Sequence, residues 1–302
     1  MPAKGSDRIA YALLLFTALF WGGNAIAGKL AVGHISPMTL TFARWFAAFL
    51  IMAAFGWPQL RRDWSAVRNH VPLLLAYGIF GFALFNITLY TALKYTSAIN
   101  VAIEQSAMPM FIFLANFALF GMRVSLSQIL GFCLSVVGVA LVASNGNLAR
   151  LATLDINRGD ALMIFAVLLY SGYTVALRYK PAIDWKSLMS VMAFSAMVTS
   201  LPFAIWEQMS GNGIRPDMRG LAVAGYTAIF PAILAQVFYM RGVEMIGGNR
   251  AGLFINGVPV FGALLAIAIL GERFQTFHAM ALVLVIGGIW MAERNPARDK
   301  PV

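Results

Sequence analysis

The sequence has a single cysteine, Cys133, and few charged residues, which occupy 11% of its 302 positions. One cysteine cannot form an internal disulfide or build a cysteine-based metal cluster. Ordinary soluble domains carry about 25% charged residues, whereas 60% of this chain is hydrophobic. Even a large soluble domain buries only about 75% of the surface that its unfolded chain exposes. The composition therefore excludes a soluble enzyme, a nucleic-acid-binding protein and a disordered scaffold, and it indicates a polytopic membrane protein.

Long apolar runs give the number of membrane spans. A helix that crosses a bilayer needs about 20 mostly apolar residues. Ten runs meet this requirement, at residues 9–32, 37–56, 71–93, 96–120, 125–144, 160–179, 187–206, 218–240, 247–270 and 275–292. The remaining residues supply connections of about nine residues each, which leaves no room for an extramembrane domain. The sequence predicts an all-α integral membrane protein with ten transmembrane helices.

Basic residues are unevenly distributed between the connections. Lys and Arg, for example Arg61, Arg62 and Lys180, are about twice as frequent on the side of the two termini as on the other side. Because cytoplasmic loops are enriched in Lys and Arg, residues 1–8 and 293–302 are expected to be cytoplasmic tails. The same bias explains the net charge of +10 without a polyanionic partner, so no nucleic acid is expected to bind.

The chain overlays itself after a shift of about 150 residues. In this register Pro109, Phe111, Gly121, Arg123 and Gly138 fall on Pro259, Phe261, Gly271, Arg273 and Gly288. The repeated units are residues 9–144 and 160–292, joined by the loop 145–159. Each unit holds five spans, an odd number, so the two units must cross the membrane in opposite directions. Inverted repeats of this kind place a substrate site near the membrane midplane between the halves, so we expect a central cavity there.

Several segments carry a family resemblance. They are Trp21-Gly22-Gly23-Asn24, Pro109, and Gly271-Glu272-Arg273-Phe274 followed by Gly287-Gly288. Together with the five-plus-five repeat, over 9–144 and 160–292, they resemble the drug/metabolite transporter superfamily and its EamA-type families. Within these the chain looks most like the YddG-type aromatic amino-acid exporters. The resemblance implies export of amino acids, aromatic ones favoured, across a bacterial inner membrane. One position departs from the pattern, because Met122 stands where the second repeat has Glu272.

Two ionisable residues lie well inside predicted spans. Arg44 follows Pro37 by seven residues, and Glu104 follows Ser97 by seven, so each lies about 10 Å below the outer surface. One interpretation is an ion pair that clamps two helices together. The other is functional: Arg44 would bind a substrate carboxylate, while Glu104 would bind its ammonium group or take up a proton. Polar groups inside a membrane usually face the bundle interior.

Polar and aromatic side chains recur at helical spacing on six spans. Interhelical hydrogen bonds could explain each stripe alone, but they cannot all face lipid, and together they indicate a shared polar lumen. The mid-span aromatic rings could stack on a substrate or face an ammonium group. The predicted cavity residues are Trp21, Asn24, Arg44, Asn86, Tyr90, Asn100, Glu104, Tyr170, Tyr173, Gln236, Tyr239 and Asn256.

Pro109 and Pro259 lie near the centres of two equivalent spans. A proline inside a helix removes one backbone hydrogen bond and bends the helix. Their matched positions predict either hinges for alternating access or static kinks that neighbouring helices tolerate.

The function classes can be compared on motifs. The sequence has no His-Glu-x-x-His zinc helix, no Gly-x-Ser-x-Gly nucleophile elbow and no P-loop, and His34, His70 and His278 are expected at the membrane interface. An inverted repeat favours alternating access over a channel. We therefore predict a secondary transporter of small molecules, not an enzyme, without a metal, a cofactor or an obligatory protein partner. The alternative is a multidrug, quaternary-cation or other metabolite efflux carrier, and the energy coupling stays open.

Overall fold

The computed structural model describes residues 4–121, 125–147, 157–211, 213–246, 251, 254–255 and 257–294, and across these residues the regular structure is helical. The helices, in chain order, are α1 (Lys4–Ala31), α2 (Pro37–Arg62), α3 (Trp64–Asn69), α4 (Val71–Ala76), η1 (Tyr77–Leu84), α5 (Phe85–Ala92), α6 (Ala98–Gln105), α7 (Met108–Phe120), α8 (Leu126–Ala143), α10 (Arg158–Ala176), η2 (Leu177–Tyr179), α11 (Trp185–Met209), α12 (Met218–Ile229), η3 (Phe230–Leu234), α13 (Ala235–Ile246), α15 (Val258–Leu265), η4 (Ala266–Leu270) and α16 (Thr276–Arg294).

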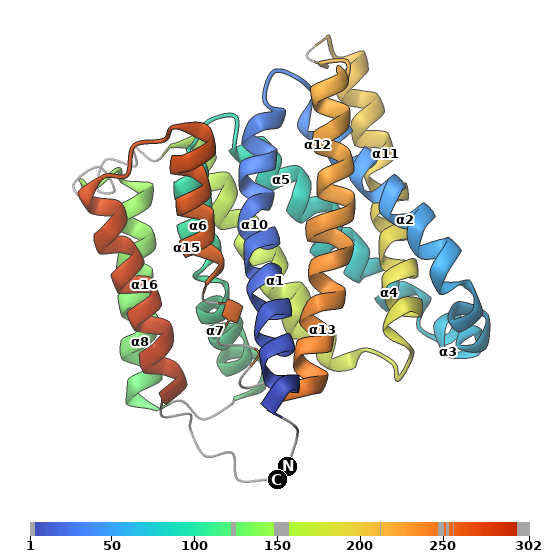
Figure 1. Cartoon of the computed structure of the whole chain (residues 1–302), viewed down its shortest axis with the longest axis horizontal. Helices are drawn as coiled ribbons and strands as arrows, with labels where there is room; N and C mark the ends of the chain where they lie inside the picture. The colour runs from blue at the N-terminus through green and yellow to red at the C-terminus, as the bar shows by residue number, and fades with distance from the viewer. Residues whose placement is uncertain are drawn as a thin grey trace.

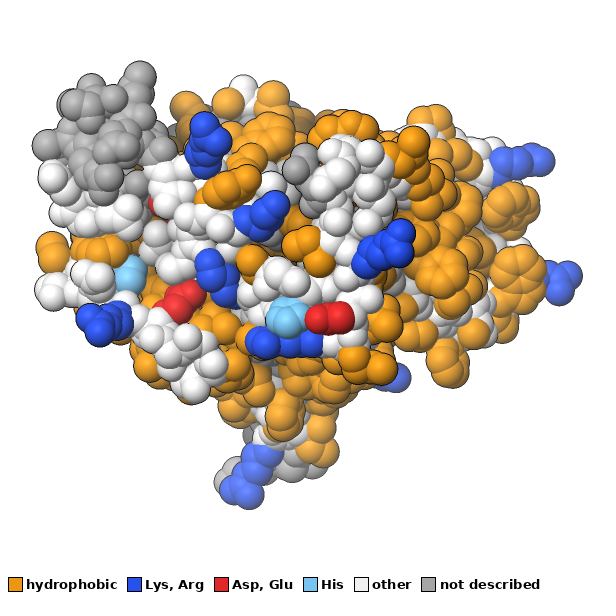
Figure 2. Space-filling view, turned by 90° about the horizontal axis from the view of Figure 1, so that it is seen from above, with side chains coloured by type: hydrophobic (Ala, Val, Ile, Leu, Met, Phe, Trp, Pro, Cys, Tyr) orange, Lys and Arg blue, Asp and Glu red, His pale blue; other side chains and the backbone are white. Residues whose placement is uncertain are grey.

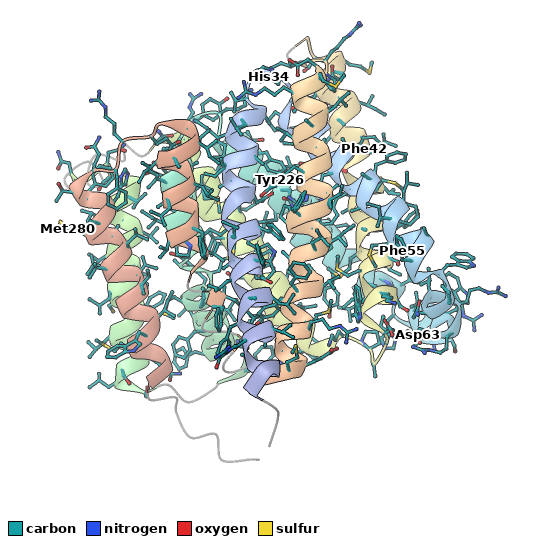
Figure 3. The ribbon with its side chains drawn as sticks, in the orientation of Figure 1. His34, Phe42, Phe55, Asp63, Tyr226 and Met280 are labelled. Carbon is teal, nitrogen blue, oxygen red and sulfur yellow. The ribbon has the colours of Figure 1, made fainter. Side chains whose placement is uncertain are left out.

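Within the described residues, seven helical segments are long and apolar enough to cross a membrane, and they coincide with predicted spans. The predicted spans 125–144, 247–270 and 275–292 contain shorter apolar helices. Large hydrophobic side chains point outward around the bundle, among them Phe55 (73% exposed) and Met280 (54% exposed) (Figure 3). An apolar exterior of this extent is what a bilayer solvates, so the chain is a multi-pass membrane protein.

The helices lie side by side in one bundle (Figure 1). α8 and α16 pack together at one edge, α2 and α11 pack together toward the other, and α1 runs between them in contact with α12, α13 and α15. At the end where α1 meets α2, charged and polar side chains gather over the bundle, whereas hydrophobic side chains cover its flanks (Figure 2). The larger cluster of buried hydrophobic side chains includes residues of α1, α5, α6 and α10, which therefore line the interior.

Two contacts between α8 and α16 involve positions that are equivalent after a shift of 150 residues. A Cβ atom at Gly138 would lie 3.0 Å from the carbonyl oxygen of Ala281, and one at Gly288 would lie 2.4 Å from that of Gly131. Adding 150 to Gly138 gives Gly288, and subtracting it from Ala281 gives Gly131. The two contacts are thus equivalent, and the small residues let the antiparallel backbones approach closely.

Hydrogen bonds to acidic side chains connect the ends of α2 and α11. Glu207, at the end of α11, accepts hydrogen bonds from the backbone N–H of Met38 (3.3 Å) and of Thr39 (2.9 Å) in the first turn of α2. Asp63, directly after α2, accepts hydrogen bonds from the backbone N–H of Asp184 (2.7 Å) and from the Ser187 hydroxyl (2.8 Å) at the start of α11. Each helix therefore supplies an acceptor for the unpaired N–H groups that begin the other.

The helices that contain Pro109 and Pro259 begin close to these prolines. The sequence instead predicted that each proline lies inside a continuous helix. α6 ends at Gln105 and α7 begins at Met108, so Pro109 lies in the first turn of a new helix. Pro259 likewise lies in the first turn of α15. A proline there removes no hydrogen bond, because the first N–H groups of a helix have no intrahelical acceptor. The expectation of two helix-interior kinks is corrected to two helix breaks.

Candidate functional site

The centre of the candidate site is a buried arginine. Arg44 of α2 is 5% exposed, and its Nη1 donates to Asn24 Oδ1 of α1 (2.7 Å) and to the Tyr90 hydroxyl of α5 (2.5 Å). The Tyr90 hydroxyl in turn donates to Asn24 Oδ1 (2.9 Å). Both partners are neutral, and Arg44 Nε has no hydrogen-bond partner. Burial of a guanidinium group without a negatively charged partner is energetically costly. The group therefore favours the binding of an anion.

Two glycines of α1 allow the surrounding rings to reach this arginine. A Cβ atom at Gly23 would lie 2.4 Å from the Tyr226 hydroxyl of α12, and one at Gly28 would lie 2.7 Å from the Tyr90 ring. Figure 3 shows Tyr226 directed into the interior beside α1. A side chain at either glycine would therefore push a tyrosine away from Arg44.

Aromatic side chains from both halves of the chain surround the same region. Tyr170 of α10 lies 4.9 Å from Phe85 of α5 between ring centroids, and the Tyr226 hydroxyl lies against Gly23, next to Asn24. Trp21 lies 5.6 Å from Tyr239 between ring centroids, and Tyr170 lies 5.3 Å from Tyr173. The Trp21 indole donates to the carbonyl oxygen of Pro231 (3.2 Å) in the π-helical segment η3.

The ion pair between Arg44 and Glu104, one of two interpretations of the sequence, is not formed. Glu104 is 1% exposed, and neither of its carboxyl oxygens has a hydrogen-bond partner. Arg44 belongs to α2, which packs on α11, α12 and α5, whereas α6, which carries Glu104, packs on α1, α10 and α15. Equal depth in the membrane therefore did not imply lateral proximity.

The other predicted cavity residues that the structure describes form no hydrogen bond with Arg44. The Asn86 side chain donates to the Phe82 carbonyl of η1 (2.7 Å), and its Oδ1 has no partner. Gln236 and Tyr239 are half-buried on α13. Asn100 lies in a second polar cluster near Glu104, and Asn256 lies outside the described residues.

The second polar cluster joins α6, α10 and α16, and most of it was missed in the sequence. Asn100 Nδ2 donates to Thr96 Oγ1 (3.1 Å) and Asp160 Oδ1 (3.4 Å), and its Oδ1 lies 3.1 Å from His278 Nε2. The Thr96 hydroxyl also donates to Asp160. His278 is 5% exposed. Asp160 and His278 each stand in the first turn of a helix, where sequence alone suggests capping or interfacial contact.

One end of the site is closed by charged side chains at helix ends. Lys29 Nζ donates to the carbonyl oxygens of Leu93 (2.9 Å) and Thr96 (2.6 Å). The Glu272 carboxylate accepts the backbone N–H groups of Ala98 (2.8 Å) and Ile99 (3.0 Å) at the start of α6. These contacts join α1, the α5–α6 connection and the loop before α16 on the same face.

A cavity of about 50 Å³ lies beside the Arg44 cluster, and Tyr90, Lys94 and Pro37 are among its lining residues. Sites for small molecules usually measure about 300–1,000 Å³, so this cavity admits little more than water. In this conformation the Arg44 cluster is therefore almost closed on this side.

Comparison with known proteins gives a consistent result. The sequence pattern of the EamA-like transporter family matches residues 8–144 and again 157–293. The "Uncharacterized transporter YyaM" of Bacillus subtilis is 25% identical, over 93% of this chain and 92% of the relative. An "Uncharacterized transporter" of Archaeoglobus fulgidus is 28% identical, over 92% and 95%. A "Probable amino-acid metabolite efflux pump" of Salmonella typhimurium is 23% identical, over 92% and 93%.

A solved crystal structure matches with a TM-score of 0.62 over 95% of this chain and 99% of that one. Its sequence identity is 20%, so this likeness concerns the fold alone.

Proposed function

Since the chain belongs to the EamA-like transporter family of the drug/metabolite transporter superfamily, we propose that it is a secondary transporter that exports amino acids, aromatic ones above all, across the bacterial inner membrane. The observation that carries the proposal is the buried Arg44 guanidinium, whose hydrogen-bond partners Asn24 and Tyr90 are both neutral. A substrate carboxylate would supply the missing anion and could bind the guanidinium in a bidentate manner.

The aromatic rings near Arg44 would select the substrate side chain. Trp21 and Tyr239 come from α1 and α13, and Tyr170 and Tyr173 come from α10, so rings from several helices would enclose a planar group. Offset or edge-to-face contacts between rings add about 0.5–1.5 kcal/mol beyond the burial of their area. The relative named as a probable amino-acid metabolite efflux pump supports this substrate class.

The proposed mechanism is alternating access between two inverted five-helix repeats, residues 9–144 and 160–292, with both termini in the cytoplasm. Two observations support it: the family pattern matches the chain twice, and the α8–α16 contacts at Gly138 and Gly288 are equivalent after a shift of 150. In this scheme the repeats rock around a central cavity, and the helix breaks before Pro109 and Pro259 act as hinges.

The second candidate is efflux of quaternary or multidrug cations. The specific observation in its favour is the ring pairs Trp21–Tyr239 and Tyr170–Tyr173, because aromatic faces also bind cations. Such a substrate would have no carboxylate and would gain nothing from Arg44.

Counterflow in proteoliposomes distinguishes the two candidates. Proteoliposomes that contain the purified protein and are loaded with unlabelled phenylalanine should accumulate labelled phenylalanine from the medium. Because a lost hydrogen bond to a charged group costs about 1.5–3 kcal/mol, Arg44→Gln should weaken this counterflow about 10–100-fold, and Arg44→Lys should retain part of it. Arg241→Gln, at an exposed ion pair with Glu244, is the matched control. Transport of tetraphenylphosphonium but not phenylalanine by the wild type would reject the amino-acid proposal. Undiminished phenylalanine counterflow in Arg44→Gln would reject the role of Arg44 in binding the carboxylate.

A further inference from the structure

Two acidic side chains are buried in the interior without a basic partner. Glu104 of α6 is 1% exposed and Asp160 of α10 is 0% exposed. Three of their carboxyl oxygens, Glu104 Oε1, Glu104 Oε2 and Asp160 Oδ2, have no hydrogen-bond partner, and neither residue forms an ion pair with any residue that the structure describes. A bare carboxylate in such surroundings is strongly disfavoured, so each group needs a proton or a cation.

Asn100 connects the two acids. Its side chain donates to Asp160 Oδ1 (3.4 Å), and Glu104 follows it by one turn on the same face of α6. Two carboxyl groups that share one low-dielectric region do not readily ionise together, so they behave as one site.

We propose that Glu104 and Asp160 form a proton-binding pair that couples export to the inward movement of protons. The inference rests on the proposed function, because it assigns the coupling ion of the same transporter. One carboxylic acid of the pair loses its proton to the cytoplasm, and the resulting carboxylate takes up one proton from the outer side. Proton and substrate therefore cross in opposite directions, and no bond other than O–H is made or broken.

The surroundings favour a proton over a metal ion. Hard cations such as Ca²⁺ and Mg²⁺ take about six or more oxygen ligands, whereas three unpartnered carboxyl oxygens are present here. The other oxygens of the cluster are engaged: Thr96 Oγ1 and Asn100 Oδ1 both accept hydrogen bonds within it. The pair therefore offers too few ligands for a coordinated cation.

The neighbouring charged groups do not neutralise the pair. From α1, Lys29 Nζ is engaged by the carbonyl oxygens of Leu93 and Thr96. From the loop before α16, the Glu272 carboxylate caps α6. From α16, His278 Nδ1 accepts the Gln275 N–H (3.0 Å), so Nε2 carries the ring proton and donates to Asn100. α8 and α15, which also pack near α6, contain no charged residue.

The two acids lie at different depths, which suits a relay. Asp160 stands in the first turn of α10, two residues after the exposed Arg158. Glu104 lies one turn further inside α6 than Asn100. A proton can thus enter at Asp160 from the face predicted to be external and pass inward to Glu104.

The test compares gradient-driven transport with exchange in the same proteoliposomes. An acid-inside pH gradient should drive accumulation of labelled phenylalanine by the wild type. Glu104→Gln and Asp160→Asn should each lower this accumulation by about tenfold or more, within the usual range of coupling free energies, while phenylalanine counterflow, which needs no net proton movement, persists. Glu244→Gln, at an exposed carboxylate, should leave both measurements unchanged.

The outcomes separate this inference from the proposed function. Wild-type counterflow without any response to the pH gradient would reject proton coupling and leave amino-acid export standing, as would accumulation that follows a Na⁺ gradient instead. Absence of phenylalanine counterflow in the wild type would reject the proposed function itself. If the variants do not fold, a measurement on the wild type alone tests the inference. Phenylalanine added to the protein in weakly buffered detergent solution should release protons, which a pH dye detects. Absence of this release would overturn the inference.

Discussion

Gly288 of α16 lies against the backbone of Gly131 in α8, so that a Cβ atom at position 288 would stand 2.4 Å from the Gly131 carbonyl oxygen. A backbone oxygen within a packed helix cannot rotate away as a flexible side chain would. This contact and its equivalent at Gly138 determine how closely the two helices approach.

Gly288→Ala should therefore destabilise the protein by about 1–3 kcal/mol, the usual cost of overpacking. The neighbouring Gly287 is the matched control, because a Cβ atom there meets nothing within 4 Å. Gly287→Ala should be neutral or stabilising by up to about 1 kcal/mol, since alanine favours helix. Thermal unfolding in detergent measures both, and equal melting temperatures for the two variants would contradict the described packing.

The Glu207 carboxylate should contribute measurably to stability. It accepts two backbone N–H groups at the start of α2 and the Thr39 hydroxyl (3.1 Å). Removing a cap usually costs about 0.5–2 kcal/mol. Glu207→Gln keeps one acceptor oxygen and should lose less stability than Glu207→Leu. A melting series in which both variants match the wild type would show that water replaces the cap.

Asp63 should make stability depend on pH. Hydrogen bonds from the Asp184 backbone N–H and the Ser187 hydroxyl lower the pKa of this carboxyl below its usual value. A group whose pKa is lower in the folded state stabilises the protein above its unfolded pKa, and this contribution is lost as the pH falls through the folded pKa. Asp63→Asn should thus melt below the wild type at pH 7, and the difference should shrink below about pH 4. A difference that does not change with pH would rule out this ionisation.

The Tyr90 hydroxyl should matter for substrate binding more than for folding. Tyr90→Phe removes the group that accepts from Arg44 and donates to Asn24. The lost hydrogen bond to a charged group predicts a rise of about tenfold or more in the KM for phenylalanine. Tyr95→Phe, at an exposed ring, is the control, and an unchanged KM in Tyr90→Phe would separate Tyr90 from the substrate.

The membrane orientation can be measured with introduced cysteines in a Cys133→Ser background. Exposed positions at the predicted external face, Lys94 and Arg215, should react with an impermeant maleimide on intact cells. Positions at the predicted cytoplasmic face, Arg61 and Lys180, should react only after permeabilisation. Labelling of all four from one side would contradict the predicted topology.

Much of the helical framework could be predicted from the sequence, because about 20 apolar residues in a row have few alternatives to a membrane helix. The turn glycines were also predictable: Gly121 and Gly271, matched by the shift of 150, both adopt a left-handed conformation, with φ of 61° and 68°. The helix breaks before Pro109 and Pro259 were not predicted, since hydropathy does not reveal where a continuous apolar run unwinds.

The candidate site was predictable only in part. Spacing along single helices identified Asn24, Arg44 and Tyr90, which the structure brings into contact. It gave no lateral distances, so the Arg44–Glu104 pair was wrong. It also missed Asp160, whose position in the first turn of a helix resembles an ordinary cap and whose partners come from other helices.

The Ser135 hydroxyl of α8 donates to the Val285 carbonyl oxygen of α16 (3.4 Å), and these residues are 150 positions apart. A contact between equivalent positions is what a twofold axis through an interface produces, as in symmetric homodimers. An ancestral five-helix protein could have made the same contact with a second molecule inserted upside down. Gene fusion would then have turned that subunit boundary into an interface within a single chain, leaving the two halves free to diverge, so that Arg44 and Glu104 both occur in the first half alone.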